Sequence, residues 1–167
     1  MRPRSLDSFL QGARVPFTTF QHPPAFTAQE EAAVSHVPGC SWATVVVCVA
    51  DDELILAVVP AHRLVDLDAL RLLMGAGTMR LAREREFARS YPDCELGAMP
   101  PFGPLYHQRV FVDRSLVGES QMVFNAGTHT DAIRMHFGDF AELANPIVGA
   151  FARPPVAGAA ADLVAGV

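Results

Sequence analysis

Lysine is absent from this sequence: all 13 of its basic residues are arginines, and they stand against 18 acidic residues for a net charge of −5. A protein that grips a long duplex normally presents a net basic surface. Extended duplex DNA is therefore excluded as a partner, whereas a brief contact between a local arginine patch and the end of a nucleic acid stays open. A bias in genomic composition is the simplest explanation for the missing lysines.

Cysteine and long apolar runs are also scarce. The three cysteines form no C-x-x-C pair and leave one odd thiol, which is typical of a reducing cytoplasm without structural disulfides. No apolar run approaches the length of a membrane helix, and the N-terminal segment lacks the apolar stretch of a secretory signal. We therefore expect a cytoplasmic protein without a membrane partner.

Familiar catalytic and cofactor motifs are missing as well. The sequence has no G-x-S-x-G elbow and no P-loop, and GAGTMR departs from the dinucleotide-binding fingerprint. His129 and His136 lie seven residues apart without the carboxylate and spacing of a zinc site. We expect neither a metal nor a cofactor.

Half of the 167 residues are apolar, enough for one domain with a real core. Alternating helix and strand patterns, together with a hairpin at Asp51-Asp52, predict a single α/β (α+β) domain with a mixed sheet packed with helices. Strands are expected at 15–22, 42–50, 53–61, 110–116 and 121–127, helices at 5–13, 27–37, 66–75 and 129–137, a short strand and then a helix within 78–91, and an amphipathic element broken by Pro146 within 137–151.

The two strongest strands, 42–50 and 53–61, are apolar on both faces, as expected of central strands. The domain is expected to span residues 1–153. Residues 154–167 form an Ala/Gly/Pro-rich tail that we expect to be peripheral, with helix allowed after Ala159.

The stretch GAMPPFGPLY is an unusual connector because it is apolar and constrained. Its prolines fix φ and remove backbone donors, while Gly97 permits a conformation that a side chain would block. Such a loop forms one rigid wall of a small apolar pocket, and amides near Gly97 and Ala98 could polarise a carbonyl as an oxyanion hole does. The alternative is a stiffened crossover that only covers the core. The candidate wall residues are Gly97, Ala98, Met99, Pro100, Pro101 and Phe102.

A second stretch, FNAGTHTDAIRM, reads as a strand-to-helix junction. Thr130 or Asp131 would cap the helix, Gly127 would let the chain turn close to a ligand, and His129 would orient a water or a ribose hydroxyl. These polar groups could equally be plain caps. The candidate substrate-binding residues of this stretch are Asn125, Gly127, Thr128, Thr130 and Asp131, with His129 as a catalytic candidate.

The order of these two stretches and five others along the chain resembles that in the YbaK family of aminoacyl-tRNA deacylases, which includes the editing domain of bacterial prolyl-tRNA synthetases. The other five stretches are HPPAFTAQEEA, WATVVVC, LAVVPAHRLVDLDAL, LAREREFARSYPDCELGAMPPFG and VFVDRSL. The resemblance covers about residues 5 to 153. It implies a barrel-like mixed α/β fold and hydrolysis of the ester in mischarged tRNA. It also implies a Gly-x-x-x-Pro pocket loop, matched here by Gly97 and Pro101.

One departure from the family is clear. Relatives with deacylase activity typically carry a lysine on the strand that here reads WATVVVC, where Thr44 stands, or Ala43 after a one-residue slip. An arginine from another element could replace the charge, with Arg109 and Arg134 as candidates. Alternatively, the loop amides, an ordered water and the ribose hydroxyl of the substrate could suffice, or the protein binds without catalysing.

The resemblance therefore implies a trans-editing hydrolase that acts on the 3′ end of an aminoacyl-tRNA, with Gly97, His129 and Thr44 in catalytic roles. The alternatives are a degenerate relative that binds an aminoacyl group, an amino acid or a nucleotide, and a purely structural or regulatory domain that works through its tail and dimerises. A synthetase partner, and the choice between monomer and homodimer, stay open.

Overall fold

The structure is a computed structural model that describes residues 1–155 of the chain. The helix allowed after Ala159 and most of the predicted tail lie outside these residues. Within the described part, no helix is long and apolar enough to cross a membrane.

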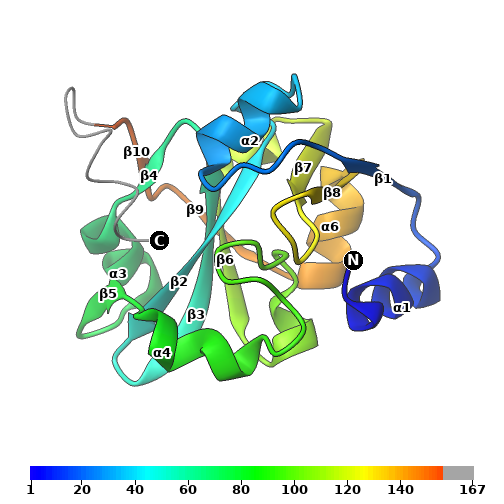
Figure 1. Ribbon diagram of the computed structural model, residues 1–167. Helices are drawn as coiled ribbons and strands as arrows, with labels where there is room; N and C mark the ends of the chain where they lie inside the picture. The colour runs from blue at the N-terminus through cyan, green and yellow to red at the C-terminus, as the bar shows by residue number, and fades with distance from the viewer. Residues whose placement is uncertain (156–167) are drawn as a thin grey trace.

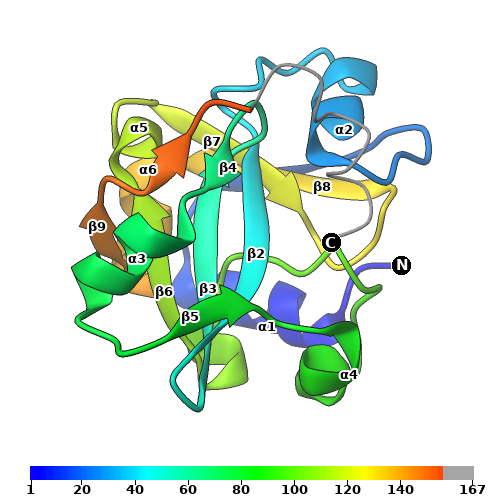
Figure 2. The same cartoon turned by 90° about the vertical axis from the view of Figure 1, so that its left-hand side faces the viewer.

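A five-stranded mixed sheet forms the centre of the molecule (Figure 1), in the order β5-β2-β3-β6-β9. The strands β2 and β3 form the predicted antiparallel hairpin, whereas β3–β6 and β6–β9 are parallel pairs. Figure 2 shows β2 and β3 side by side at the centre. The strands are β2 (Ala43–Ala50), β3 (Glu53–Pro60), β5 (Met79–Leu81), β6 (Arg109–Asp113) and β9 (Ile147–Gly149).

Two smaller antiparallel sheets complete the strand structure. One has the order β1-β8-β7 and is joined to the start of β2 by a bridge between Trp42 and Val123. The mixed α/β domain is thus confirmed, although none of the described sheets closes into a barrel. The strands are β1 (Phe17–Gln21), β7 (Gln121–Asn125), β8 (Asp131–His136), and the pair β4 (Leu64–Val65) and β10 (Ala152–Arg153).

Two helices, α2 and α3, begin at the caps that the sequence predicts, and α2 ends at Val34, before the predicted 37. Thr27 and Glu30 form the predicted capping box of α2, and Asp66 caps α3, which ends at Gly75 with φ 72°. Pro146 follows α6 and separates it from β9. The helices are α1 (Arg4–Ala13), α2 (Ala28–Val34), α3 (Leu67–Met74), α4 (Glu84–Phe87), α5 (Arg114–Val117) and α6 (Phe137–Ala144), with 3-10 turns η1 (Ala88–Ser90) and η2 (Gly103–Tyr106).

The helix expected at 129–137 is wrong, because this segment is β8. Ile133 and Met135 are buried while Arg134 and His136 are exposed, which is the two-residue period of a strand. Thr130 and Asp131 therefore cap no helix. The predicted strand at 110–116 also ends earlier, since Asp113 accepts from the Ser115 amide and begins α5.

Apolar side chains cover both faces of the β2–β3 hairpin, as the sequence predicts. The partner on the other side of β2 is short, however: β5 pairs only with Cys48, Val49 and Ala50. Between this pairing and the Trp42 bridge, residues 44–46 lack a strand partner on that side among the described residues. This open edge positions the site.

Candidate functional site

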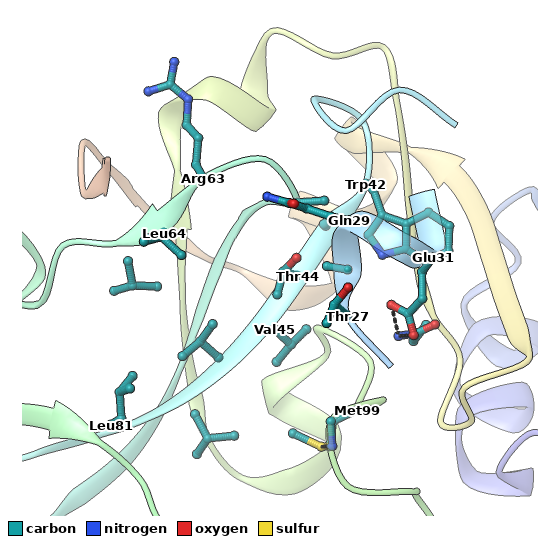
Figure 3. A pocket seen from close by; sticks show the side chains of 18 of the residues that line it. Thr27, Gln29, Glu31, Trp42, Thr44, Val45, Arg63, Leu64, Leu81 and Met99 are labelled. Atoms are coloured by element: carbon teal, nitrogen blue, oxygen red, sulfur yellow. Dashed lines mark hydrogen bonds between the residues drawn. The ribbon is translucent and has the colours of Figure 1, made fainter. Parts of the chain in front are cut away.

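A cavity of about 490 Å³ lies along the open edge of β2. The helix α2 and the residues before it form one wall, and the loop at Gly97 and Met99 forms another. Figure 3 shows Thr27, Thr44 and Met99 around this space. The remaining lining comes from β2 and from Trp42, Ala61, Arg63, Leu64, Val65, Leu67, Leu81, Ala82, Phe87, Asn125 and Arg153.

The backbone of β2 contributes polar groups to the cavity. The Val47 carbonyl accepts from the Ala82 amide, 2.9 Å away, so it points away from β3. Because backbone groups of alternate residues point to the same side of an antiparallel strand, the N–H and C=O of Val45 also face away from β3. Val45 lines the cavity, and its amide is a hydrogen-bond donor that the sequence did not reveal.

The Gly97 loop contributes Gly97 and Met99 to the cavity wall. Gly97 has φ 87°, a conformation that favours glycine, and its N–H donates to the Met99 Sδ, 3.2 Å away. The Ala98 amide instead donates to the Glu95 carbonyl, so it is not free to polarise a substrate. Ala98, Pro100, Pro101 and Phe102 are buried behind the wall and do not line the cavity.

The two stretches singled out in the sequence meet in space. The Gly127 amide donates to the Ala98 carbonyl, and the Gly127 carbonyl accepts from the Glu95 amide. Gly127 has φ 91°, and a Cβ there would come within 2.5 Å of Pro3. Its close approach is therefore to the N-terminal segment, and the β7–β8 hairpin supports the Gly97 loop from behind.

The hydroxyl groups of that hairpin serve its own turn. The Thr128 Oγ donates to the Asp131 carboxylate and accepts from the Asp131 amide, at 2.7 and 2.9 Å. Thr128, Thr130 and Asp131 do not line the cavity. These contacts agree with the alternative that the sequence left open, in which the polar groups are plain caps. They close the hairpin turn between β7 and β8, however, and cap no helix.

Glu31 is a site residue that the sequence analysis missed. Its side chain is 3% exposed, lines the cavity, and accepts from the Asn125 Nδ2 at 2.8 Å to each carboxylate oxygen. His129 Nδ1 lies 3.4 Å from the same carboxylate, and His129 Nε2 lies 2.9 Å from the Leu96 carbonyl. Burial raises the pKa of the Glu31 carboxyl above its usual range.

Thr44 lines the cavity, and its buried hydroxyl has no hydrogen-bond partner among the described residues. Trp42 does not close the space. The proposed replacement of the lysine by Arg109 or Arg134 is wrong: Arg109 pairs with Glu53 at 2.8 Å, and the Arg134 guanidinium lies over the Phe20 ring.

Two other arginines, Arg63 and Arg153, line the cavity. The Arg63 guanidinium points away from Thr44 (Figure 3), and Arg153 is exposed. Neither takes the place that the family lysine would occupy.

Metal-ligand clusters and disulfides are absent from residues 1–155. No group of three His, Cys, Asp or Glu side chains could hold an ion there, and Cys40, Cys48 and Cys94 are free thiols. Burial raises the pKa of the Cys94 thiol, next to the loop, to about 11, so it is not an activated nucleophile.

Comparison with known proteins gives the chain its family. The model of the aminoacyl-tRNA editing domain matches residues 22–143. No curated protein matches the sequence.

Solved structures share the fold. A proposed trans-editing enzyme for prolyl-tRNA synthetase superposes with a TM-score of 0.78 at 20% identity, covering 90% of this chain and 96% of that one. The hypothetical protein APE2540 superposes with a TM-score of 0.79 at 17% identity, and the match covers 90% of this chain and 100% of that one. A proposed signal transduction protein from Marinobacter aquaeolei VT8 superposes with a TM-score of 0.73 at 20% identity. The match covers 91% of this chain and 31% of that one. By the match to residues 22–143, the chain belongs to the aminoacyl-tRNA editing domain family.

Proposed function

We propose that the protein is a trans-editing deacylase that hydrolyses the ester of a mischarged aminoacyl-tRNA. A water oxygen attacks the ester carbonyl carbon, the bond to the ribose oxygen breaks, and that oxygen takes a proton, which frees the amino acid. The observation that supports this most is the Gly97 amide at the cavity wall, held only by a thioether sulfur.

Sulfur is a weak acceptor, so the Gly97 amide can exchange it for an oxyanion at little cost. The Val45 amide on the open edge of β2 is a second donor directed at the same cavity. Two preorganised N–H groups stabilise the charge that develops on the carbonyl oxygen. The reaction therefore needs no lysine, because the amides supply the electrostatic stabilisation and the free ribose hydroxyl next to the ester assists.

His129 acts as a positioning residue in this scheme. Its two ring nitrogens face the Glu31 carboxylate and the Leu96 carbonyl, and its ring does not line the cavity. It therefore holds the Glu31 side chain and the loop segment before Gly97 in place, and it does not orient the attacking water.

The tRNA end would meet the residues at the cavity mouth. Phe26 is 68% exposed, lines the cavity and packs its ring against His129 with centroids 5.1 Å apart, so it offers a face on which a base can stack. Arg63 and Arg153 supply positive charge for the backbone phosphates.

Replacing both arginines, Arg63→Gln and Arg153→Gln, is expected to weaken tRNA binding and to reduce its salt dependence. Each lost phosphate contact lowers the slope of log K against log salt by about 0.7 for a single strand. Filter binding from 50 to 300 mM salt measures the slope. The control Arg89→Gln with Arg114→Gln removes the same charge from exposed positions outside the cavity, and an equal change of slope in the control would refute the assignment.

The proposed activity is tested by mixing the protein with tRNA charged separately with alanine, serine, cysteine and proline. We expect faster ester loss than in buffer for at least one of them, with free amino acid as the product. Buffer-level loss for all four refutes hydrolysis of these substrates.

A second candidate is binding without hydrolysis, and the neutral Thr44 at the lysine position favours it. In that case the protein would retain an aminoacyl ligand and slow the loss of its ester below the buffer rate. The same assay distinguishes the two functions.

A further inference from the structure

The cavity wall contains one buried carboxyl group, Glu31, that forms no ion pair with an arginine of the described structure. Glu31 lines the cavity at 3% exposure, and its titratable neighbours in the described structure are two imidazoles: His129, whose Nδ1 lies 3.4 Å from the carboxylate, and His22. The lining arginines lie at the mouth: Arg63 points away and Arg153 is exposed. A carboxylate in an apolar wall is expensive unless something compensates it.

Asn125 adds an acceptor beside this charge. Because an ionised carboxylate only accepts, Asn125 must present Nδ2 to Glu31, and it does so at 2.8 Å to each oxygen. The amide oxygen is thereby left over: Asn125 Oδ1 is buried without a partner among the described residues, in a side chain that lines the cavity. The Thr44 hydroxyl is a further unpartnered group in the same wall.

A purely structural role would not need the charge. A glutamine at position 31 could accept from the Asn125 Nδ2 and donate to its Oδ1, which would join α2 to β7 without burying an anion. The charge therefore points to a ligand that is cationic and rich in donors. A primary ammonium fits, because its three N–H groups match the two Glu31 oxygens and the Asn125 oxygen.

We propose that Glu31 and Asn125 bind the α-ammonium of the aminoacyl group, so that the cavity selects substrates with a free amine. This inference rests on the proposed function. It predicts that the protein rejects esters whose amine is acylated, including peptidyl-tRNA, because an amide leaves the buried carboxylate facing a neutral group.

The direct test uses a stable analogue, 3′-deoxy-3′-(alanylamino)adenosine, and its N-acetyl derivative, with binding measured by calorimetry. A charge-assisted hydrogen bond of about 1.5–3 kcal/mol corresponds to a preference for the free amine of at least about 10-fold. We expect Glu31→Gln to lose this preference and Glu142→Gln, an exposed carboxylate on α6, to keep it. Equal binding of the two analogues by the wild type, or a preference unchanged in Glu31→Gln, overturns the inference.

Thermal melting separates recognition from a structural requirement. Since burial raises the folded-state pKa of Glu31, its charge destabilises the fold above that pKa and has no such effect below its ordinary value of 4.5. Glu31→Gln should therefore melt at or above the wild-type temperature at pH 7, and its advantage should vanish near pH 4. A lower melting temperature at pH 7 would show that the fold needs the charge and would contradict the inference.

Hydrolysis distinguishes this inference from the proposed function. If the wild type hydrolyses N-acetylalanyl-tRNA as fast as alanyl-tRNA, the amine selection is wrong and the deacylase stands. If it hydrolyses neither but binds the free-amine analogue preferentially, the deacylase is wrong and the ammonium site stands.

Discussion

Gly97→Leu is expected to lower kcat/KM for aminoacyl-tRNA hydrolysis at least about 100-fold, the effect of losing one oxyanion donor. Gly97 has φ 87°, so any side chain there strains the backbone and shifts the amide that donates to Met99 Sδ. The leucine side chain would also occupy the cavity that Gly97 lines. Single-turnover deacylation measures the loss.

Two matched variants separate strain from occlusion. Gly97→Ala keeps the strain but adds only a methyl group, so its loss should be smaller. Gly118→Leu adds the same side chain at an exposed glycine with φ −73° and no neighbour within 4 Å, and it should behave as wild type. Full activity in a folded Gly97→Leu protein would show that the Gly97 amide takes no part in the reaction.

Asn125→Leu is expected to destabilise the protein by about 3 kcal/mol at pH 7, the order of magnitude for removing the partner of a buried charge. Asn125 Nδ2 is the donor at 2.8 Å to both oxygens of the buried Glu31 carboxylate. The loss should shrink as pH falls through the raised pKa of Glu31, because the protonated carboxyl no longer needs that donor. Urea denaturation at pH 7 and pH 4 measures both values.

The double variant Glu31→Gln, Asn125→Leu isolates the charge. With a neutral residue at position 31, most of the pH-dependent loss should disappear, and the difference from additivity gives the coupling between the two side chains. A loss of equal size at pH 4 and pH 7, unchanged by Glu31→Gln, would mean that Asn125 acts only through packing.

Most of the fold could be predicted because helix caps and tight turns depend on residues that are close in sequence. The Thr27 capping box, the Asp66 cap with Gly75 and the hairpin at Asp51-Asp52 each rest on neighbours in sequence, and all three are present. The apolar faces of β2 and β3 likewise predicted their central place.

The helix expected at 129–137 failed because a polar start resembled a cap. Thr128 and Asp131 bond to each other within a hairpin turn, and β8 pairs with β1 and β7 on its two sides. Pairing with residues more than a hundred positions away overrode the local preference.

The site was predicted in part for the same reason. Gly97, Met99, Thr44 and Asn125 do line one cavity. Glu31 could not be found from sequence, because its partner Asn125 is 94 positions away and the local pattern shows only a helical glutamate. The engagement of the Ala98 amide by Glu95 depends on the turn geometry of the loop, which composition does not determine.

In the proposed reaction, this cavity hydrolyses an aminoacyl ester without a lysine. Single-turnover deacylation of wild type, Thr44→Lys and the neutral, similarly sized Thr44→Met tests it most directly. We expect the wild type to be active. We expect Thr44→Lys to be slower than Thr44→Met, because the lysine ammonium would compete with the substrate ammonium for Glu31. A wild type at the buffer rate, with activity appearing only in Thr44→Lys, would contradict the proposed hydrolysis and leave a pocket that binds without catalysing.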